Sequence, residues 1–261
     1  MIRRRIISGL AGISLVVFVL WAGEVAFLIL VGSAALIGIS EYMAMWKAKG
    51  AQLVTGLAYA GVAAYILTAH FYGETYFAGI VTGLLLLGLS IQVFSLLRYN
   101  VLDIGVSIFG VLYVGMLFSY LILLRQLPNP MVVLALVLGG TWGCDVLAFF
   151  VGIRFGNRKL CPQISPNKSV EGAWGGVLGS ILTTTIIGLI AAVPARHFIP
   201  LGFLIAAAAQ IGDLAESSLK RYLEVKDSGN IIPGHGGILD RCDSLIFVAP
   251  VVYYYIKLFI L

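Results

Sequence analysis

The first 23 residues decide the fold class, and they read MIRRRIISGLAGISLVVFVLWAG. Three arginines at positions 3–5 precede an apolar run over residues 6–23 that contains no charged side chain. Its length is close to the ~20 residues that an α-helix needs to cross the hydrocarbon core of a bilayer. The start is similar to a secretory signal, but no small-residue cleavage site follows Trp21 and another apolar run comes directly after it. We therefore predict an uncleaved first membrane span.

Composition extends this interpretation to the rest of the chain. Of the 261 residues, 60% are hydrophobic and 11% are charged, whereas a soluble domain has about half its residues apolar and about a quarter charged. Lipid cannot satisfy backbone amides, and glycine-rich apolar runs without polar alternation favour helices over barrel strands. We predict an all-α, polytopic integral membrane protein with about nine transmembrane helices. The expected spans are residues 6–23, 25–43, 51–70, 77–97, 104–124, 131–153, 173–193, 199–212 and 243–261.

Positive charge orients these spans. With the N-terminus in the cytoplasm, 14 of the 17 Lys and Arg residues fall on the cytoplasmic side, and Arg125, Arg196 and Lys257 fall on the other side. This distribution satisfies the positive-inside rule. Topology and anionic lipid thus explain the net charge of +5, and no nucleic-acid partner is expected. The three cysteines lack CxxC spacing and are expected to be free thiols.

Acidic residues are concentrated near the C-terminus. Of the 12 carboxylates, six lie between positions 213 and 243, and a carboxylate at the end of an apolar helix is costly unless it is paired, metal-bound or in a wet cavity. We therefore divide the chain into N-terminal transmembrane helices at 1–130 and catalytic transmembrane helices at 131–261. The catalytic part includes two cytoplasmic-side loops, residues 154–172 and 213–243.

The 213–243 loop combines acidic and phosphate-friendly features. If the eighth helix continues past Asp213, one face carries Asp213, Glu216, Ser217, Lys220 and Glu224. A salt-bridged surface stripe would give the same pattern, but the segment that follows argues against it. Its glycines at 234, 236 and 237 let backbone N–H groups approach an anion, and Asp240 and Asp243 share one side of the next helix. Carboxylates beside a bound phosphate require a cation between them, which predicts a divalent metal such as Mg²⁺.

A second polar cluster lies upstream on the same predicted side of the membrane. Asp145 is an intramembrane carboxylate, and Ser165, Lys168 and Ser169 offer donors for a phosphate, with Glu171 placed to orient Lys168. Arg154 and Arg158 fit positive-inside anchoring. His235 fits a turn-fixing role as well as a phosphate contact or a general acid. For Glu41, at the cytoplasmic end of the second span, interface placement is as good an explanation as function.

At this point the sequence resembles a known family, the phosphatidate cytidylyltransferases or CDP-diacylglycerol synthases. The similarity covers Ser217, Lys220-Arg221, Lys226-Asp227, Gly229, Pro233, His235-Gly-Gly and Asp240-Arg-x-Asp. The family's upstream element, Ser-Pro-Lys-Lys-Thr-x-Glu-Gly, is echoed by residues 165–172, and its Asp with an aromatic pair by Asp145 and Phe149-Phe150. Two positions depart from the pattern. Asn167 replaces the first lysine, which shifts the phosphate role to Lys168, and Cys242 replaces a larger apolar residue.

The resemblance implies transfer of the cytidylyl group of CTP to phosphatidate, which gives CDP-diacylglycerol and pyrophosphate for phospholipid synthesis. It implies Mg²⁺, with a monovalent ion such as K⁺ as a second candidate, a site on the cytoplasmic side of the inner membrane, and compatibility with a homodimer. The implied catalytic residues are Lys168, Lys220, Arg221, Lys226, Asp227 and Arg241. The implied substrate-binding residues are Asp145, Ser165, Ser169, Glu171, Ser217, Gly234, His235, Gly236 and Gly237, and the implied metal ligands are Asp213, Asp240 and Asp243.

Three alternatives stand beside this interpretation. A cation-coupled transporter would explain Asp145 and Asp213 but not the basic, glycine-rich loop beside Asp240. A CDP-alcohol phosphotransferase would carry an Asp-Gly pair in its motif, and the sequence contains none. A third alternative is a cytidylyltransferase that acts on another lipid phosphate, such as an isoprenoid phosphate or an ether lipid. Its reaction would be of the same type, and only the lipid acceptor would differ.

Overall fold

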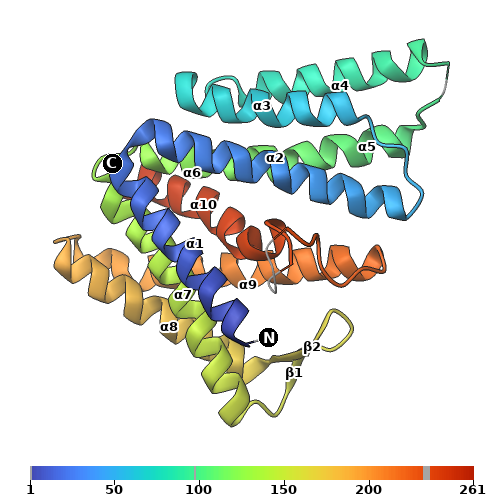
Figure 1. Ribbon diagram of the computed structural model, residues 1–261. Helices are drawn as coiled ribbons and strands as arrows, with labels where there is room; N and C mark the ends of the chain where they lie inside the picture. Colours follow the sequence, from blue (N-terminus) through green and yellow to red (C-terminus); the bar gives the residue numbers. More distant parts are fainter. Residues whose placement is uncertain (1, 97, 232–235) are drawn as a thin grey trace. The chain divides into compact units, whose positions relative to one another are not determined.

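The computed structural model describes residues 2–96, 98–231 and 236–261, and helices dominate it (Figure 1). A small hairpin and short π- and 3-10 segments are the other regular elements of the described chain. The helical elements are α1 (Ile2–Ala22), α2 (Glu24–Ala48), α3 (Thr55–Tyr72), α4 (Phe77–Phe94), α5 (Val101–Gly110), the π-helix η1 (Val111–Met116), α6 (Leu117–Arg125), α7 (Pro130–Phe155), α8 (Val170–Ile190), the 3-10 helix η2 (Ala195–His197), α9 (Phe198–Tyr222) and α10 (Leu239–Phe259).

Within the described residues, seven helical segments are long and apolar enough to cross a membrane, which confirms the polytopic all-α prediction. These segments are Glu24–Ala48, Phe77–Phe94, Val101–Arg125, Pro130–Phe155, Val170–Ile190, Ala195–Tyr222 and Leu239–Phe259. The expected spans 6–23 and 51–70 also form helices, α1 and α3. Among the described residues, α3 is not one of the seven segments, and the Gly12–Ala22 part of α1 is a shorter apolar helix.

The chain folds as two compact units. Unit 1 consists of Met1–Leu123 and Tyr222–Arg241, and unit 2 consists of Leu124–Arg221 and Cys242–Leu261. The chain therefore passes from one unit to the other within α6, α9 and α10. The segment that carries the glycine-rich motif belongs with the N-terminal helices, although it lies about 100 residues further along the chain.

Unit 1 has a core of large, fully buried side chains that includes Tyr42, Tyr65 and Phe118. Close helix packing at Gly115 contributes to it, because a Cβ on that residue would lie 2.9 Å from the Cα of Val62. A capping box begins α5, in which Asn100 and Asp103 each accept a backbone N–H from the other. The carboxylate of Asp103 also accepts the N–H of Gln52 at 2.9 Å, so it ties two loops of unit 1 together.

Unit 2 is organised by the close approach of α7 and α8. A Cβ on Gly179 would lie 2.1 Å from the carbonyl oxygen of Gly143, so only glycine permits this spacing. The helices are joined by an antiparallel hairpin of β1 (Lys159–Cys161) and β2 (Ser165–Ser169). Residues 154–172 were predicted to form a loop, and strands were not expected there. The hairpin holds Lys168 at a fixed register beside the start of α8.

Candidate active site

The two polar clusters predicted from the sequence meet in unit 2 through an ion pair. Lys168 lies on β2 and Asp213 on α9, and the lysine Nζ is 2.5 Å from Oδ2 of Asp213. Both side chains are about one-third exposed or less, at 28% and 35%. Beside Lys168, the hydroxyl of Ser169 accepts the N–H of Gly172 at 3.1 Å and caps α8. The cap fixes the strand end and thereby the point from which Lys168 extends.

Helix α9 continues past Asp213 as predicted and carries further polar side chains. Ser217 Oγ donates to Oδ1 of Asp213 at 3.3 Å, and Lys220 Nζ donates to Oε2 of Glu216 at 2.7 Å. The Glu216 side chain is fully buried, so the charge of Lys220 offsets a carboxylate that has no access to water. The helix ends at Tyr222, and the prediction that Glu224 shares this face is wrong, because Glu224 has a left-handed φ of 59° beyond the helix.

Asp243 on α10 completes this group. It lies within electrostatic range of Asp213, Glu216 and Lys220. Helices α9 and α10 approach closely at this level, because a Cβ on Gly212 would lie 2.5 Å from the backbone oxygen of Asp243. We call Lys168, Asp213, Glu216, Lys220 and Asp243 the lysine–carboxylate site. The negative carboxylates of this site repel one another, and the positive ammonium groups of Lys168 and Lys220 offset that repulsion.

This donor set suits a cation in charge and in ligand chemistry. Carboxylate oxygens are the ligands that Mg²⁺ prefers, and Asp213 already holds a cationic group, the ammonium of Lys168. In the part of the chain that the structure describes, no three His, Cys, Asp or Glu side chains form a cluster that could hold a metal ion. The predicted set of three aspartates therefore stays a prediction.

Other predicted residues of unit 2 have different contacts from those expected. The Glu171 carboxylate accepts the N–H groups of Asn157 and Arg158 at 3.1–3.3 Å, so it fixes the turn before the hairpin instead of orienting Lys168. Arg221 Nε donates to the carbonyl of Ile164 at 3.3 Å and so joins α9 to the hairpin. Ser165 lies on β2, and Asp145 is exposed on α7.

The glycine-rich segment belongs to unit 1, where it surrounds Asp240. Oδ2 of Asp240 accepts three hydrogen bonds, from Ser228 N at 2.8 Å, Ser228 Oγ at 2.9 Å and Gly237 N at 2.8 Å. The N–H of Gly237, expected to face a phosphate, thus donates to a carboxylate. Gly236 has a φ of 82°, a left-handed backbone conformation that glycine adopts more easily than other residues. The predicted residues Gly234 and His235 lie outside the described residues. Three other predicted site residues of this segment, Lys226, Asp227 and Arg241, are exposed.

Glu41 has contacts that its position at the end of an apolar span did not indicate. This residue of α2 is 4% exposed, and it accepts hydrogen bonds from Ile238 N at 2.9 Å, Leu239 N at 3.0 Å and Ser228 Oγ at 3.2 Å. We call Glu41, Ser228, Gly237, Ile238, Leu239 and Asp240 the Glu41 network. Its partners are nearly 200 residues away in the chain, so no local spacing could have revealed it.

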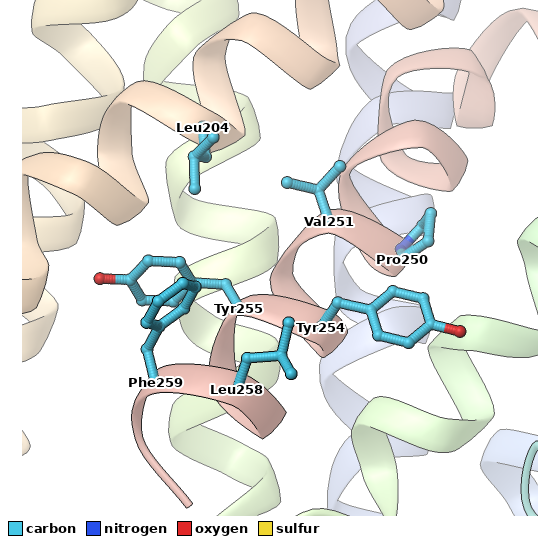
Figure 2. Close-up of a pocket in the computed structure, with 7 residues that line it drawn as sticks. All are labelled: Leu204, Pro250, Val251, Tyr254, Tyr255, Leu258 and Phe259. Atoms are coloured by element: carbon cyan, nitrogen blue, oxygen red, sulfur yellow. The ribbon is translucent and has the colours of Figure 1, made fainter.

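An apolar groove of about 360 Å³ lies in unit 2 (Figure 2). Leu204 contributes from α9, and the other lining residues come from α10: Pro250, Val251, Tyr254, Tyr255, Leu258 and Phe259. Leu204 precedes Asp213 by nine residues and Pro250 follows Asp243 by seven. At 1.5 Å per helical residue, the groove begins roughly 10–14 Å along both helices from the lysine–carboxylate site.

These features define a class of protein, a polytopic membrane protein with a lysine–carboxylate site suited to phosphates and cations. The chain belongs to the cytidylyltransferase family, because the model of that family matches residues 3–259. It is therefore a nucleotidyltransferase, and the membership favours this interpretation over cation-coupled transport.

Curated relatives agree with the family assignment. The chain is 35% identical to a phosphatidate cytidylyltransferase of Bacillus subtilis, over 98% of both chains. It is 33% identical to a protein of the same name from Synechocystis, over 98% of this chain and 96% of the relative. A third relative of that name, from Thermotoga maritima, is 44% identical over 47% of this chain and 48% of its own length.

Proposed function

We propose that this protein transfers the cytidylyl group of CTP to phosphatidate at the lysine–carboxylate site and produces CDP-diacylglycerol. The observation that carries the proposal is the contact between Lys168 and Asp213. It joins the upstream element at 165–172 to the helix that begins the downstream signature, so the two motifs that resemble the family meet at one site. The names of the relatives from B. subtilis and Synechocystis support the choice of substrates.

The reaction is a phosphoryl-type substitution. A phosphate oxygen of phosphatidate attacks the α-phosphorus of CTP, the bond from that phosphorus to the β-phosphate oxygen breaks, and pyrophosphate leaves. A phosphomonoester is already largely ionised near neutral pH, because its second pKa is about 6. The attacking group therefore needs no general base. The protein's task is to position two anionic substrates and to offset their charge.

The basic residues of unit 2 suit that task. Lys168 and Lys220 each contact a carboxylate, and an ammonium group can exchange a carboxylate partner for a phosphate oxygen as substrate arrives. Arg221 is exposed next to the hairpin and adds a further cationic side chain. Lys226, Asp227 and Arg241, all exposed in unit 1, are proposed to contact the nucleotide or the pyrophosphate.

We propose Mg²⁺ as the cofactor, held by Asp213 and Asp243. Asp240 is proposed as a third ligand because it precedes Asp243 by three residues in α10. A bound Mg²⁺ would offset the charge of the phosphates and of the departing pyrophosphate.

The apolar groove supports a lipid acceptor. It begins within about 14 Å of Asp213 along α9, a distance that one acyl chain covers while its headgroup stays at the charged site. The lining is apolar apart from the tyrosine hydroxyls, as a hydrocarbon chain requires. We propose that the site faces the cytoplasmic side of the inner membrane, where CTP is available, and the positive-inside distribution of charge supports this orientation.

Pyrophosphate release from CTP tests the proposal and its acceptor. Purified protein with Mg²⁺ is given phosphatidate, an isoprenoid phosphate or a phosphorylated ether lipid in separate reactions. We expect release with phosphatidate at a rate well above that with the other two. Lys168→Met should lower the rate, whereas Lys257→Met, a lysine near the far end of α10, should not. Release only with another lipid phosphate would reassign the acceptor, and no release would reject the enzyme assignment.

A further inference from the structure

The position of Asp240 depends on a residue from a distant helix. We propose that Glu41 is a positioning residue, which fixes Asp240 and the start of α10 by binding the backbone N–H groups of Ile238 and Leu239. The proposal rests on the proposed function, because it assigns Asp240 to the reaction. Neither the family signature nor the spacing of the acidic residues includes Glu41.

The first argument is the number and type of donors that reach Glu41. Oε1 accepts Ile238 N, and Oε2 accepts both Leu239 N and Ser228 Oγ, at 2.9–3.2 Å. The first N–H groups of a helix have no partner within the helix and favour a negative charge nearby. Glu41 therefore acts as an N-terminal cap for α10, but it is supplied by α2 instead of by the preceding residues.

The second argument is that one hydroxyl connects Glu41 to Asp240. Ser228 Oγ lies 3.2 Å from Oε2 of Glu41 and 2.9 Å from Oδ2 of Asp240, so the two carboxylates share its single hydroxyl proton. Ser228 also donates its backbone N–H to Asp240 at 2.8 Å. A shift of the Glu41 carboxylate would thus move the hydroxyl and, through it, two of the three donors that hold Oδ2 of Asp240.

The third argument is steric. A Cβ on Gly237 would lie 2.5 Å from Oε2 of Glu41, and a Cβ on Gly229 would lie 2.7 Å from Oε1. Both glycines therefore place their backbone directly against the carboxylate. Glu41 is 4% exposed, so burial of this charge is tolerated only while these donors surround it. The carboxylate and the segment on both sides of it hold each other in one arrangement.

Glu41→Gln tests the proposal with nearly unchanged shape. The amide keeps one acceptor oxygen but turns an NH₂ group toward backbone N–H donors, so at least one of the three contacts becomes donor against donor. Asp103→Asn is the matched control, because Asp103 is also buried in unit 1 and also accepts backbone N–H groups. It lies outside the Glu41 network and has no proposed part in the reaction.

Three readouts separate positioning from general stability. In Glu41→Gln we expect the Mg²⁺ concentration for half-maximal activity to rise, or kcat to fall, by about 10- to 100-fold, the range seen when partners of metal ligands are changed. The KM for phosphatidate should stay near the wild-type value. Backbone hydrogen exchange should increase at Ile238 and Leu239. Asp103→Asn, measured at a temperature at which both variants are fully folded, should show wild-type Mg²⁺ dependence and wild-type hydrogen exchange at Ile238 and Leu239.

Ser228→Ala is a second variant in case Glu41→Gln does not fold. It removes only the hydroxyl, and we expect about a fivefold loss in the same direction, as for one hydrogen bond. Wild-type Mg²⁺ dependence and exchange in the folded variants would overturn the proposal. If the wild-type protein itself forms no lipid product, the proposed function fails instead, and the exchange at Ile238 and Leu239 still decides whether Glu41 holds the segment.

Discussion

The Glu41 network and the lysine–carboxylate site both surround carboxylates, but with different kinds of partner. In the Glu41 network the donors are two backbone N–H groups and a hydroxyl for Glu41, and the same kinds of neutral donor for Asp240. In the lysine–carboxylate site, Asp213 and Glu216 each have a charged partner, the ammonium group of Lys168 or Lys220.

The two kinds of partner predict different behaviour: the carboxylates of the Glu41 network stay in place, whereas those of the lysine–carboxylate site can change partner. A carboxylate that accepts backbone N–H groups from a helix start stays in place unless the backbone moves. A carboxylate paired with a lysine side chain can release it, since the side chain can rotate toward a phosphate while a cation takes its position. We therefore expect substitutions of the partly exposed Lys168 and Asp213 to affect turnover alone, and substitutions in the Glu41 network to affect both turnover and stability.

The largest expected effect is that of Asp213→Asn. Loss of the charge removes a proposed Mg²⁺ ligand and the partner of Lys168, so kcat should fall by at least about 100-fold, as for loss of one electrostatic contact to a transition state. The side chain is about one-third exposed, and the thermal midpoint should therefore change little. Parallel measurement of kcat and of thermal unfolding in detergent checks both statements. A large drop in the midpoint would show that Asp213 also holds the fold together, as Glu41 and Asp240 do.

Asp240→Asn should lower both quantities. All three hydrogen bonds go to Oδ2, and an amide oxygen in that position accepts them without the negative charge. A hydrogen bond to a charged group contributes about 1.5–3 kcal/mol, whereas a neutral one contributes about 0.5–1.5 kcal/mol. We expect a lower thermal midpoint than for Asp213→Asn together with a strong loss of turnover. If Asp240→Asn were as stable as the wild type and fully active, Asp240 would have neither role.

Leu204→Trp should have a smaller and selective effect. The indole would fill part of the groove in Figure 2, so activity with long-chain phosphatidate should fall several-fold while activity with a short-chain analogue is retained. The ratio of kcat/KM for the two lipids is the measurement. Leu67→Trp, an exposed leucine on α3 in unit 1, is the control and should leave that ratio unchanged. An unchanged ratio in Leu204→Trp would remove the groove from the acceptor site.

The smallest effect is expected at the exposed ion pair of Lys49 and Glu224 in unit 1. The hydrogen bond from Lys49 lowers the pKa of Glu224 below its usual value. A lowered pKa contributes stability above the unfolded-state value, about 4.3 for Glu, and this contribution is lost as the pH falls through the lower folded value. Lys49→Met should therefore be slightly less stable near neutral pH and equal to the wild type in acid. A pH series of thermal midpoints checks this, and a difference that grows in acid would contradict it.

The sequence predicted the parts of this structure that depend on local spacing. The face of α9 from Asp213 to Lys220 followed from helical periodicity, and the spans followed from the length of apolar runs. The end of α9 before Glu224 depends on a left-handed residue, which composition does not reveal. The hairpin around Lys168 and the contacts of Glu41 depend on pairing between distant segments, so no single stretch of sequence contains them.

The most direct test of the central claim follows the label of CTP into lipid. Purified protein is incubated with phosphatidate, Mg²⁺ and CTP labelled either in the α-phosphate or in the γ-phosphate, and the lipid is extracted. We expect labelled lipid from the α-labelled nucleotide only, with the γ label released as pyrophosphate. Label in lipid from the γ-phosphate, or no labelled lipid from either nucleotide, would contradict it.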